Sequence, residues 1–260
     1  MSLAVLTSRA LVGLAAPEVS VEVHLANGLP AFALVGLPDV EVREARDRVR
    51  AALQTSQFEF PQRRITVNLA PADLPKEGGL FDLAIALGIL AASGQIPADA
   101  LAQYEFSGEL SLSGELRPVR GALATSLALH GLEPPVRMVL PPGSAEEAAL
   151  VPGAQVYRAR HLLDVVRHFL PAGAQEPIDD NAATDDGWCL LQPAPLATQA
   201  VYADLSDVKG QVVAKRALEI AAAGGHSLLM MGPPGSGKSM LAQRFAGLLP
   251  AMTLEEALES

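Results

Sequence analysis

The sequence predicts a mixed α/β (α+β) fold in two domains, and three observations support this prediction. Apolar residues alternate with polar ones early in the chain and then recur at helical spacing. Strand-type and helix-type segments continue to follow one another up to residue 170. An acidic, proline-containing segment follows over residues 171–200, and ordered patterns resume after it. We therefore expect a first domain over residues 1–170, a linker over 171–200 and a second domain over 201–260.

Composition excludes several classes of protein. The formal net charge of −10 argues against a generally basic nucleic-acid coat, and the single cysteine, Cys189, excludes a disulfide framework. No basic region precedes the first apolar run, so we expect no signal peptide and a cytoplasmic location. The most apolar stretch, residues 81–94, carries Asp82 and is too short to span a bilayer.

The first elements follow from the change of hydrophobic period. Segments such as "VSVEVHLANG" and "AFALVG", between residues 4 and 36, predict strands with one buried face, and Asn27-Gly28 is a hairpin-type turn signal. A helix of about four turns is predicted next, with Asp39 as its N-cap. Its apolar stripe consists of Val42, Ala45, Val49, Ala52 and Leu53.

The rest of the first domain continues the alternation. "RRITVNLAP" predicts a strand, and "LPKEGGL" a loop before a core helix near Phe81. "QYEFSGELSLSGELRPV" predicts strands joined by a turn at Ser113-Gly114, and "GALATSLALHG" a helix ended by Gly131. A strand, a short helix, another strand and a helix follow, up to Pro171.

Two features stand out in the remaining residues. Within the linker, residues 188–191 ("WCLL") interrupt the polar run, and we expect them to dock on a neighbouring surface. In the second domain, residues 211–223 and "SMLAQRFAGLL" have helical spacing, whereas "HSLLMM", residues 226–231, predicts a short buried strand.

The segment "GPPGSGKS" matches the phosphate-binding pattern G-x-x-x-x-G-K-[ST] between an apolar run and a helix. Its glycines allow backbone N–H groups to surround phosphates, and the helix N-terminus adds its dipole. We expect Lys238 to reach the β- and γ-phosphates of ATP and the Ser239 hydroxyl to ligate Mg²⁺. The predicted nucleotide-binding residues are Gly232, Pro233, Pro234, Gly235, Ser236, Gly237, Lys238 and Ser239.

Hydrolysis would require an acidic residue at the end of another strand, and no apolar run ending in such a residue follows Ser239. Glu255 and Glu256 lie in a helix start, where Thr253 and Glu256 form a capping box. We therefore predict no catalytic residue in this chain, expect that it is cut inside a domain, and expect no ATP turnover at an enzymatic rate.

Two long segments carry a family resemblance. The run "DLSDVKGQVVAKRALEIAAAGGHSLLMMGPPGSGKSMLA" resembles the opening of the AAA+ module of magnesium-chelatase-like ATPases. "LVGLPDVEVREARDRVRAAL" and "ITVNLAPADLPKEGGLFDLAIALGILAASG" resemble the N-terminal domain of the ComM/YifB branch. The resemblance implies a Lon-protease-like fold of the ribosomal-protein-S5 domain 2 type, and adenine contacts near Asp207 and Val208.

The resemblance also implies what the intact protein does. It would be an ATP-driven ring, a homo-hexamer, that acts on branched or single-stranded DNA in recombination during competence. Two alternatives stay open: the ATPase subunit of a magnesium chelatase, and a non-enzymatic module that binds DNA or a partner. About 230 residues precede the phosphate-binding pattern, and this order favours the DNA motor over the chelatase subunit.

The likeness to the Lon protease raises the question of a serine–lysine dyad. The resemblance places Leu80 at the serine position and Leu123 at the lysine position, so peptidase chemistry is not expected. Lys76 and Glu77 are most simply loop residues, and a binding role is the alternative that stays open for them.

The basic residues gather in one region. They are Arg43, Arg46, Arg48, Arg50, Arg63 and Arg64. Such side chains could contact DNA phosphates, but Arg43–Asp47 and Glu44–Arg48 also have the i,i+4 spacing of surface ion pairs.

Overall fold

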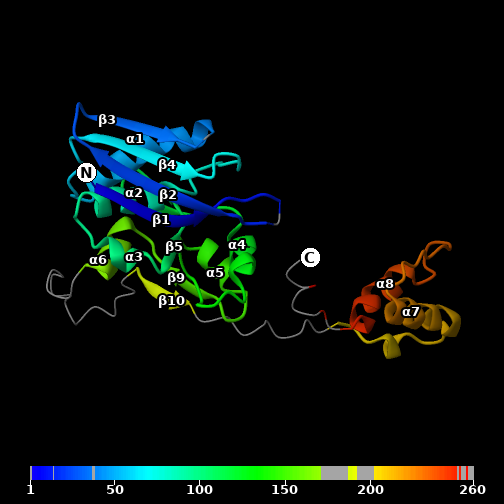
Figure 1. The fold of residues 1–260 in the computed structure, drawn as a ribbon. Helices are drawn as coiled ribbons and strands as arrows, with labels where there is room; N and C mark the ends of the chain where they lie inside the picture. The colour runs from blue at the N-terminus through cyan, green and yellow to red at the C-terminus, as the bar shows by residue number, and fades with distance from the viewer. Residues whose placement is uncertain are drawn as a thin grey trace. The chain divides into compact units, whose positions relative to one another are not determined.

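The computed structural model describes residues 2–13, 15–36, 39–170, 187–191 and 202–250, together with residues 252 and 256. The chain divides into two compact units, Met1–Ala194 and Pro195–Ser260. The first unit holds a large sheet, and the second holds helices α7 and α8 (Figure 1).

An eight-stranded mixed sheet organises the first unit, with the strand order β10-β9-β8-β5-β1-β2-β4-β3. The strands are β1 (Ser2–Arg9), β2 (Glu18–Ala26), β3 (Ala31–Val35), β4 (Arg64–Ala70), β5 (Tyr104–Phe106), β8 (Arg137–Leu140), β9 (Gln155–Arg158) and β10 (Cys189–Leu191). Strands β1, β5, β8 and β9 run parallel, as do β3 and β4, whereas β2 is antiparallel to both of its neighbours. The strands β6 (Glu109–Leu110) and β7 (Leu116–Arg117) form a separate hairpin.

Helices cover this sheet and complete two cores. Helices α1 (Val40–Thr55) and α2 (Asp82–Ala92) lie behind the strands β1 to β4 in Figure 1, and α6 (Leu162–Phe169) joins their core. Helices α4 (Ala122–Leu129) and α5 (Ser144–Ala148) pack on the other face of β8 and β9, because Met138 and Leu140 belong to their core while Val139 belongs to the first. The short α3 (Ala98–Leu101) follows α2. This mixed α/β architecture confirms the predicted fold class.

The predicted start and core face of α1 are confirmed. The Asp39 carboxylate accepts a hydrogen bond of 2.7 Å from the Val42 N–H, as an N-cap does. Every residue of the predicted apolar stripe is fully buried. The predicted core helix is α2, of which all but one of the residues are buried. In the part of the chain that the structure describes, no helix has the length and apolar character needed to cross a membrane.

The hairpin predicted from Asn27-Gly28 is wrong. Strands β2 and β3 flank this turn, but both pair with β4, which lies between them. A turn signal reports local backbone preference, whereas strand order depends on which faces the whole sheet must bury.

Residues 188–191 lie within the range predicted as a linker, yet they belong to the first unit. Strand β10 pairs antiparallel with β9, and the Trp188 ring stacks on His168 at 4.2 Å and on Tyr157 at 5.1 Å between ring centroids. The expected docking of this segment is confirmed, and the linker prediction is wrong for these four residues. Partial burial of the large indole ring against these aromatic residues stabilises a short strand that could not persist alone.

The second unit is small and largely helical. It contains the 3₁₀ turns η1 (Leu205–Asp207) and η2 (Ala246–Leu248), and the helices α7 (Val212–Gly224) and α8 (Lys238–Phe245), which match the two predicted helices. Leu205, Val208, Leu218 and Leu241 form its buried core. The predicted capping box at Thr253 lies outside the described residues.

The buried strand predicted over residues 226–231 does not form. This segment has no regular secondary structure, and Leu229 and Met231 are 84% and 85% exposed. A strand needs a hydrogen-bonded neighbour, and the described residues of this unit contain no other strand. The apolar run is therefore present without the partner that would bury it.

Candidate nucleotide-binding loop and its surroundings

The glycine-rich loop leads into α8 through backbone conformations that favour glycine. Gly235 and Gly237 have φ angles of +81° and +86°, and Gly237 is the N-cap of α8. The Ser236 hydroxyl donates to the Pro233 carbonyl at 2.9 Å, which tightens the turn. The loop is thus curved around the first turn of a helix, the arrangement from which backbone N–H groups can approach an anion.

The Lys238 ammonium group lies within this curve. Its Nζ donates to the carbonyls of Gly232 and Pro233, both at 2.8 Å, and lies 3.3 Å from Ser236 Oγ. The side chain therefore folds back over the loop and does not extend into solvent. A positive charge is held where the sequence pattern predicts contact with phosphate.

The segment before α7 is tied to the loop and to α8. Gln211, whose φ is +52°, donates from Nε2 to the Ser236 carbonyl at 3.2 Å. Arg244 of α8 donates to the Asp204 carbonyl at 3.0 Å, and its guanidinium lies 3.6 Å from Asp207 Oδ2. The Val208 side chain is buried in the small core, so only its backbone is free to meet a base.

Ser239, the predicted Mg²⁺ ligand, is exposed on the first turn of α8. The part of the chain that the structure describes has no group of three or more His, Cys, Asp or Glu residues that could hold a metal ion. A hydroxyl group is a ligand type that Mg²⁺ accepts together with phosphate oxygens and water.

Comparison with known proteins decides the family. The family model described as "Subunit ChlI of Mg-chelatase" matches residues 21–143, and the one described as "Magnesium chelatase, subunit ChlI" matches residues 204–260. Competence protein ComM of Haemophilus influenzae is 51% identical over this whole chain, and YifB of Escherichia coli, described as uncharacterized, is 46% identical over it. The chain belongs to the ComM/YifB family of magnesium-chelatase-like proteins.

The similarity extends beyond these two relatives but covers only part of each. An uncharacterized protein of Mycobacterium tuberculosis is 41% identical over 97% of the chain. The chain spans 49%, 48% and 47% of these three relatives, about half the length of a ComM/YifB protein.

A cleft lies where the resemblance to Lon places the serine of a peptidase. Its volume is about 420 Å³, and it is formed by Ala10, Leu11, Pro75, Glu77, Gly78, Gly79, Leu80, Glu109, Pro118, Val119 and Arg120. This lining holds no Ser, Thr, Cys or Lys side chain, and Leu123 is not part of it. Among its described residues, the lining of this cleft therefore contains neither member of a serine–lysine dyad.

Sequence reasoning missed the burial of Lys76. The residue is 1% exposed, and its Nζ donates to the carbonyls of Leu74, at 2.9 Å, and Pro71. Burial lowers the pKa of this ammonium group, and the nearby Asp73 opposes the shift. The Lys76 side chain thus closes the loop over residues 71–76 by hydrogen bonds to its backbone. No sequence signal distinguishes this lysine from an exposed loop lysine.

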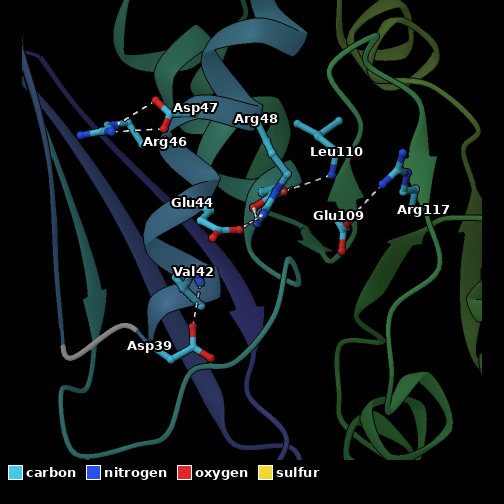
Figure 2. A network of polar contacts seen from close by, with 10 residues as sticks. Asp39, Val42, Glu44, Arg46, Asp47, Arg48, Glu109, Leu110 and Arg117 are labelled. Carbon is cyan, nitrogen blue, oxygen red and sulfur yellow. Dashed lines mark hydrogen bonds and ion pairs between the residues drawn. The ribbon is translucent and has the colours of Figure 1, made fainter.

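The arginines of the basic region differ in their ionic partners. The expected Glu44–Arg48 pair forms at 3.7 Å, but Asp47 pairs with Arg46, in place of the expected Arg43. Arg48 turns inward to Asp82, with 2.6 Å between Nε and Oδ2 and 3.1 Å between the guanidinium and Oδ1 (Figure 2). Arg48 is therefore a structural residue and cannot serve as a phosphate contact.

The Arg48–Asp82 pair connects three elements. Asp82 opens α2 and is 1% exposed, Arg48 belongs to α1, and the Leu110 N–H of β6 donates to Asp82 Oδ2 at 3.2 Å (Figure 2). Burial raises the pKa of Asp82 to about 6, although the Arg48 hydrogen bonds and charge and the Leu110 N–H oppose the shift. The carboxylate is thus ionised at neutral pH but gains a proton under mild acid.

We expect this raised pKa to appear in the pH dependence of stability. Between the usual Asp pKa and about 6, the folded state holds a proton on Asp82 that the unfolded state has lost. The stabilisation of the folded state by this proton is complete below the usual Asp pKa and disappears as the pH rises through about 6. The unfolding free energy of the parent chain minus that of Asp82→Asn should decrease by about 2 kcal/mol between pH 4 and pH 7. Urea unfolding across this range measures it, and a constant difference would contradict the raised pKa.

Proposed function

We propose that this chain binds Mg-ATP at residues 232–239 and forms part of an ATP-driven motor that migrates DNA branches during recombination. The observation that carries the nucleotide site is the position of the Lys238 ammonium group, inside the curve of a glycine loop at the N-terminus of α8. In the ATP-bound state Lys238 would exchange its carbonyl partners for phosphate oxygens. Asp207 and Val208 would lie beside the adenine.

The first test uses the chain as it is. Mg-ATP at a hundredfold excess over its dissociation constant should raise the unfolding free energy by about 2.7 kcal/mol, measured as a thermal shift. Lys238→Ala should abolish the shift, because it removes the charge that compensates the phosphates. Lys215→Ala is the matched control, since it removes a lysine of α7 in the same unit and should keep the shift. Equal shifts in all three proteins would refute the site.

The motor role is tested in the complete protein. ATP hydrolysis by it should be stimulated by four-way-junction DNA, and Lys238→Ala should remove this activity. The name of the Haemophilus relative, a competence protein, supports a role with incoming DNA. We further propose that the complete protein works in the cytoplasm as a homo-hexamer, which sedimentation in the presence of Mg-ATP would test.

A chelatase-type ATPase subunit is the second candidate, because both matching family descriptions name magnesium chelatase. The chain has a further domain in addition to the unit with the glycine loop, because the first unit, with its eight-stranded sheet, precedes that loop. Lys238-dependent ATP turnover that is indifferent to every DNA structure would favour this candidate over the DNA motor.

A further inference from the structure

A pocket of about 320 Å³ opens at the β3 edge of the large sheet. It lies between α1, the start of β3 and the segment before β4, and it is lined by Pro30, Ala31, Phe32, Arg46, Asp47, Arg50, Phe60, Pro61, Gln62 and Arg63. Strand β3 is the last in the strand order of the sheet, and no further strand among the described residues pairs with this margin. The volume is at the lower end of the range of small-ligand sites and suits one nucleotide unit.

Two aromatic rings form one side of the pocket. Phe32 and Phe60 are half-buried, with their centroids 6.4 Å apart and their planes within 12° of each other. The Arg50 guanidinium lies over the Phe60 ring, 5.3 Å from its centroid. The pocket therefore combines a parallel pair of aromatic rings with a cation over one of them, and aromatic faces and guanidinium groups are the side-chain groups on which a planar base stacks.

The charge around these rings is positive, in contrast with the net charge of −10 for the whole chain. Arg46, Arg50 and Arg63 are all exposed, and Asp47 is the only acidic residue among the described residues of the lining. Among the described residues, Arg50 and Arg63 have no carboxylate within 4 Å, whereas Arg46 holds Asp47 at 3.1 Å on the open surface. Two guanidinium groups are therefore available to phosphate without breaking an ion pair.

We propose that this pocket binds single-stranded DNA, with a base against Phe32 and Phe60 and the flanking phosphates on Arg50 and Arg63. The choice of DNA rests on the proposed function, whereas the choice of a single strand rests on the pocket, because the bases of a duplex already stack on one another and cannot reach a side-chain ring. Stacking and phosphate contact do not depend on base identity, so the pocket binds without sequence preference.

The test is fluorescence anisotropy of a labelled oligo-dT of about 20 nucleotides with the whole chain. Arg50→Gln with Arg63→Gln should weaken binding at least about tenfold and reduce the slope of log K against log salt by about 1.4, for two phosphate contacts. Phe60→Leu should weaken binding at least about fivefold with no change of the salt slope. A labelled DNA duplex of the same length should bind more weakly than the single strand.

The matched control is Arg117→Gln with Arg216→Gln, which removes the same charge from exposed arginines outside the pocket. It should change affinity less than twofold, and thermal melting should show that every variant is folded. Equal losses in the pocket and control variants would overturn the pocket while leaving a DNA role intact. Failure of the parent chain to bind the oligonucleotide would also overturn it, while the Lys238-dependent ATP shift would still decide the nucleotide site.

Discussion

Replacing Arg48 with methionine is expected to lower the free energy of unfolding by about 3 kcal/mol at pH 7, as measured by urea denaturation. The change keeps much of the packing of the side chain but leaves the carboxyl group of Asp82, which is 1% exposed, with the Leu110 N–H as its one remaining donor among the described residues. Protonation limits the cost, because a buried carboxyl group without its cation becomes neutral. The loss should therefore shrink at pH 5, where Asp82 is protonated in the parent chain as well.

Arg46→Met is the matched control for this prediction. Arg46 lies on the same helix and also pairs with an aspartate, but the two side chains are 55% and 71% exposed, so the pair is worth little. Its replacement should change stability by less than about 0.5 kcal/mol. A loss from Arg48→Met no greater than that from Arg46→Met would show that the buried pair does not hold α1 to α2.

The elements that could be predicted from the sequence are those with a single apolar face, whose residues recur at the period of a strand or a helix. Strand β2 alternates strictly, with Val19, Val21, Val23 and Leu25 buried, and the stripe of α1 follows from its 3.6-residue period. Pattern alone suffices there, because a single apolar face must meet a core whatever its neighbours are.

Partner choice could not be predicted in the same way. The Asn27-Gly28 turn gave no sign that β4 would enter between β2 and β3, and residues 226–231 have a strand pattern without a strand beside them. Each depends on residues distant in the sequence. Strand pairing is therefore a property of the assembled sheet and not of the segment.

The candidate functional residues likewise divide into those that one short segment reveals and those that depend on distant partners. The glycine loop, Lys238 and Ser239 are recognisable because their chemistry demands fixed spacing in one short segment. Arg48 and Lys76 are ordinary surface residue types, and only the positions of Asp82 and of the carbonyls of residues 71 and 74 show that Arg48 turns inward and that Lys76 is buried. The pocket of Phe32, Arg50 and Phe60 likewise combines three separate segments.

Gly36→Ala is expected to be the most damaging single-methyl addition at the β3 edge, with a loss of about 3 kcal/mol or more. Gly36 follows β3 with a φ of +103°, and a Cβ there would lie 2.1 Å from the Leu69 carbonyl oxygen of β4. That obstacle is backbone in a paired strand, so it cannot move aside as a flexible side chain would. The substitution should push β3 away from β4 and lower the melting temperature.

Gly28→Ala separates the two causes of this loss. Gly28 also has a positive φ, +144°, but no atom lies within 4 Å of an added Cβ. Its replacement therefore adds backbone strain without a clash and should cost only about 1–2 kcal/mol. Because β3 carries Phe32, Gly36→Ala should also weaken oligo-dT binding, whereas Gly28→Ala should weaken it less. Equal destabilisation by the two variants would mean that strain alone, and not the close approach of β3 to β4, explains the glycine at position 36.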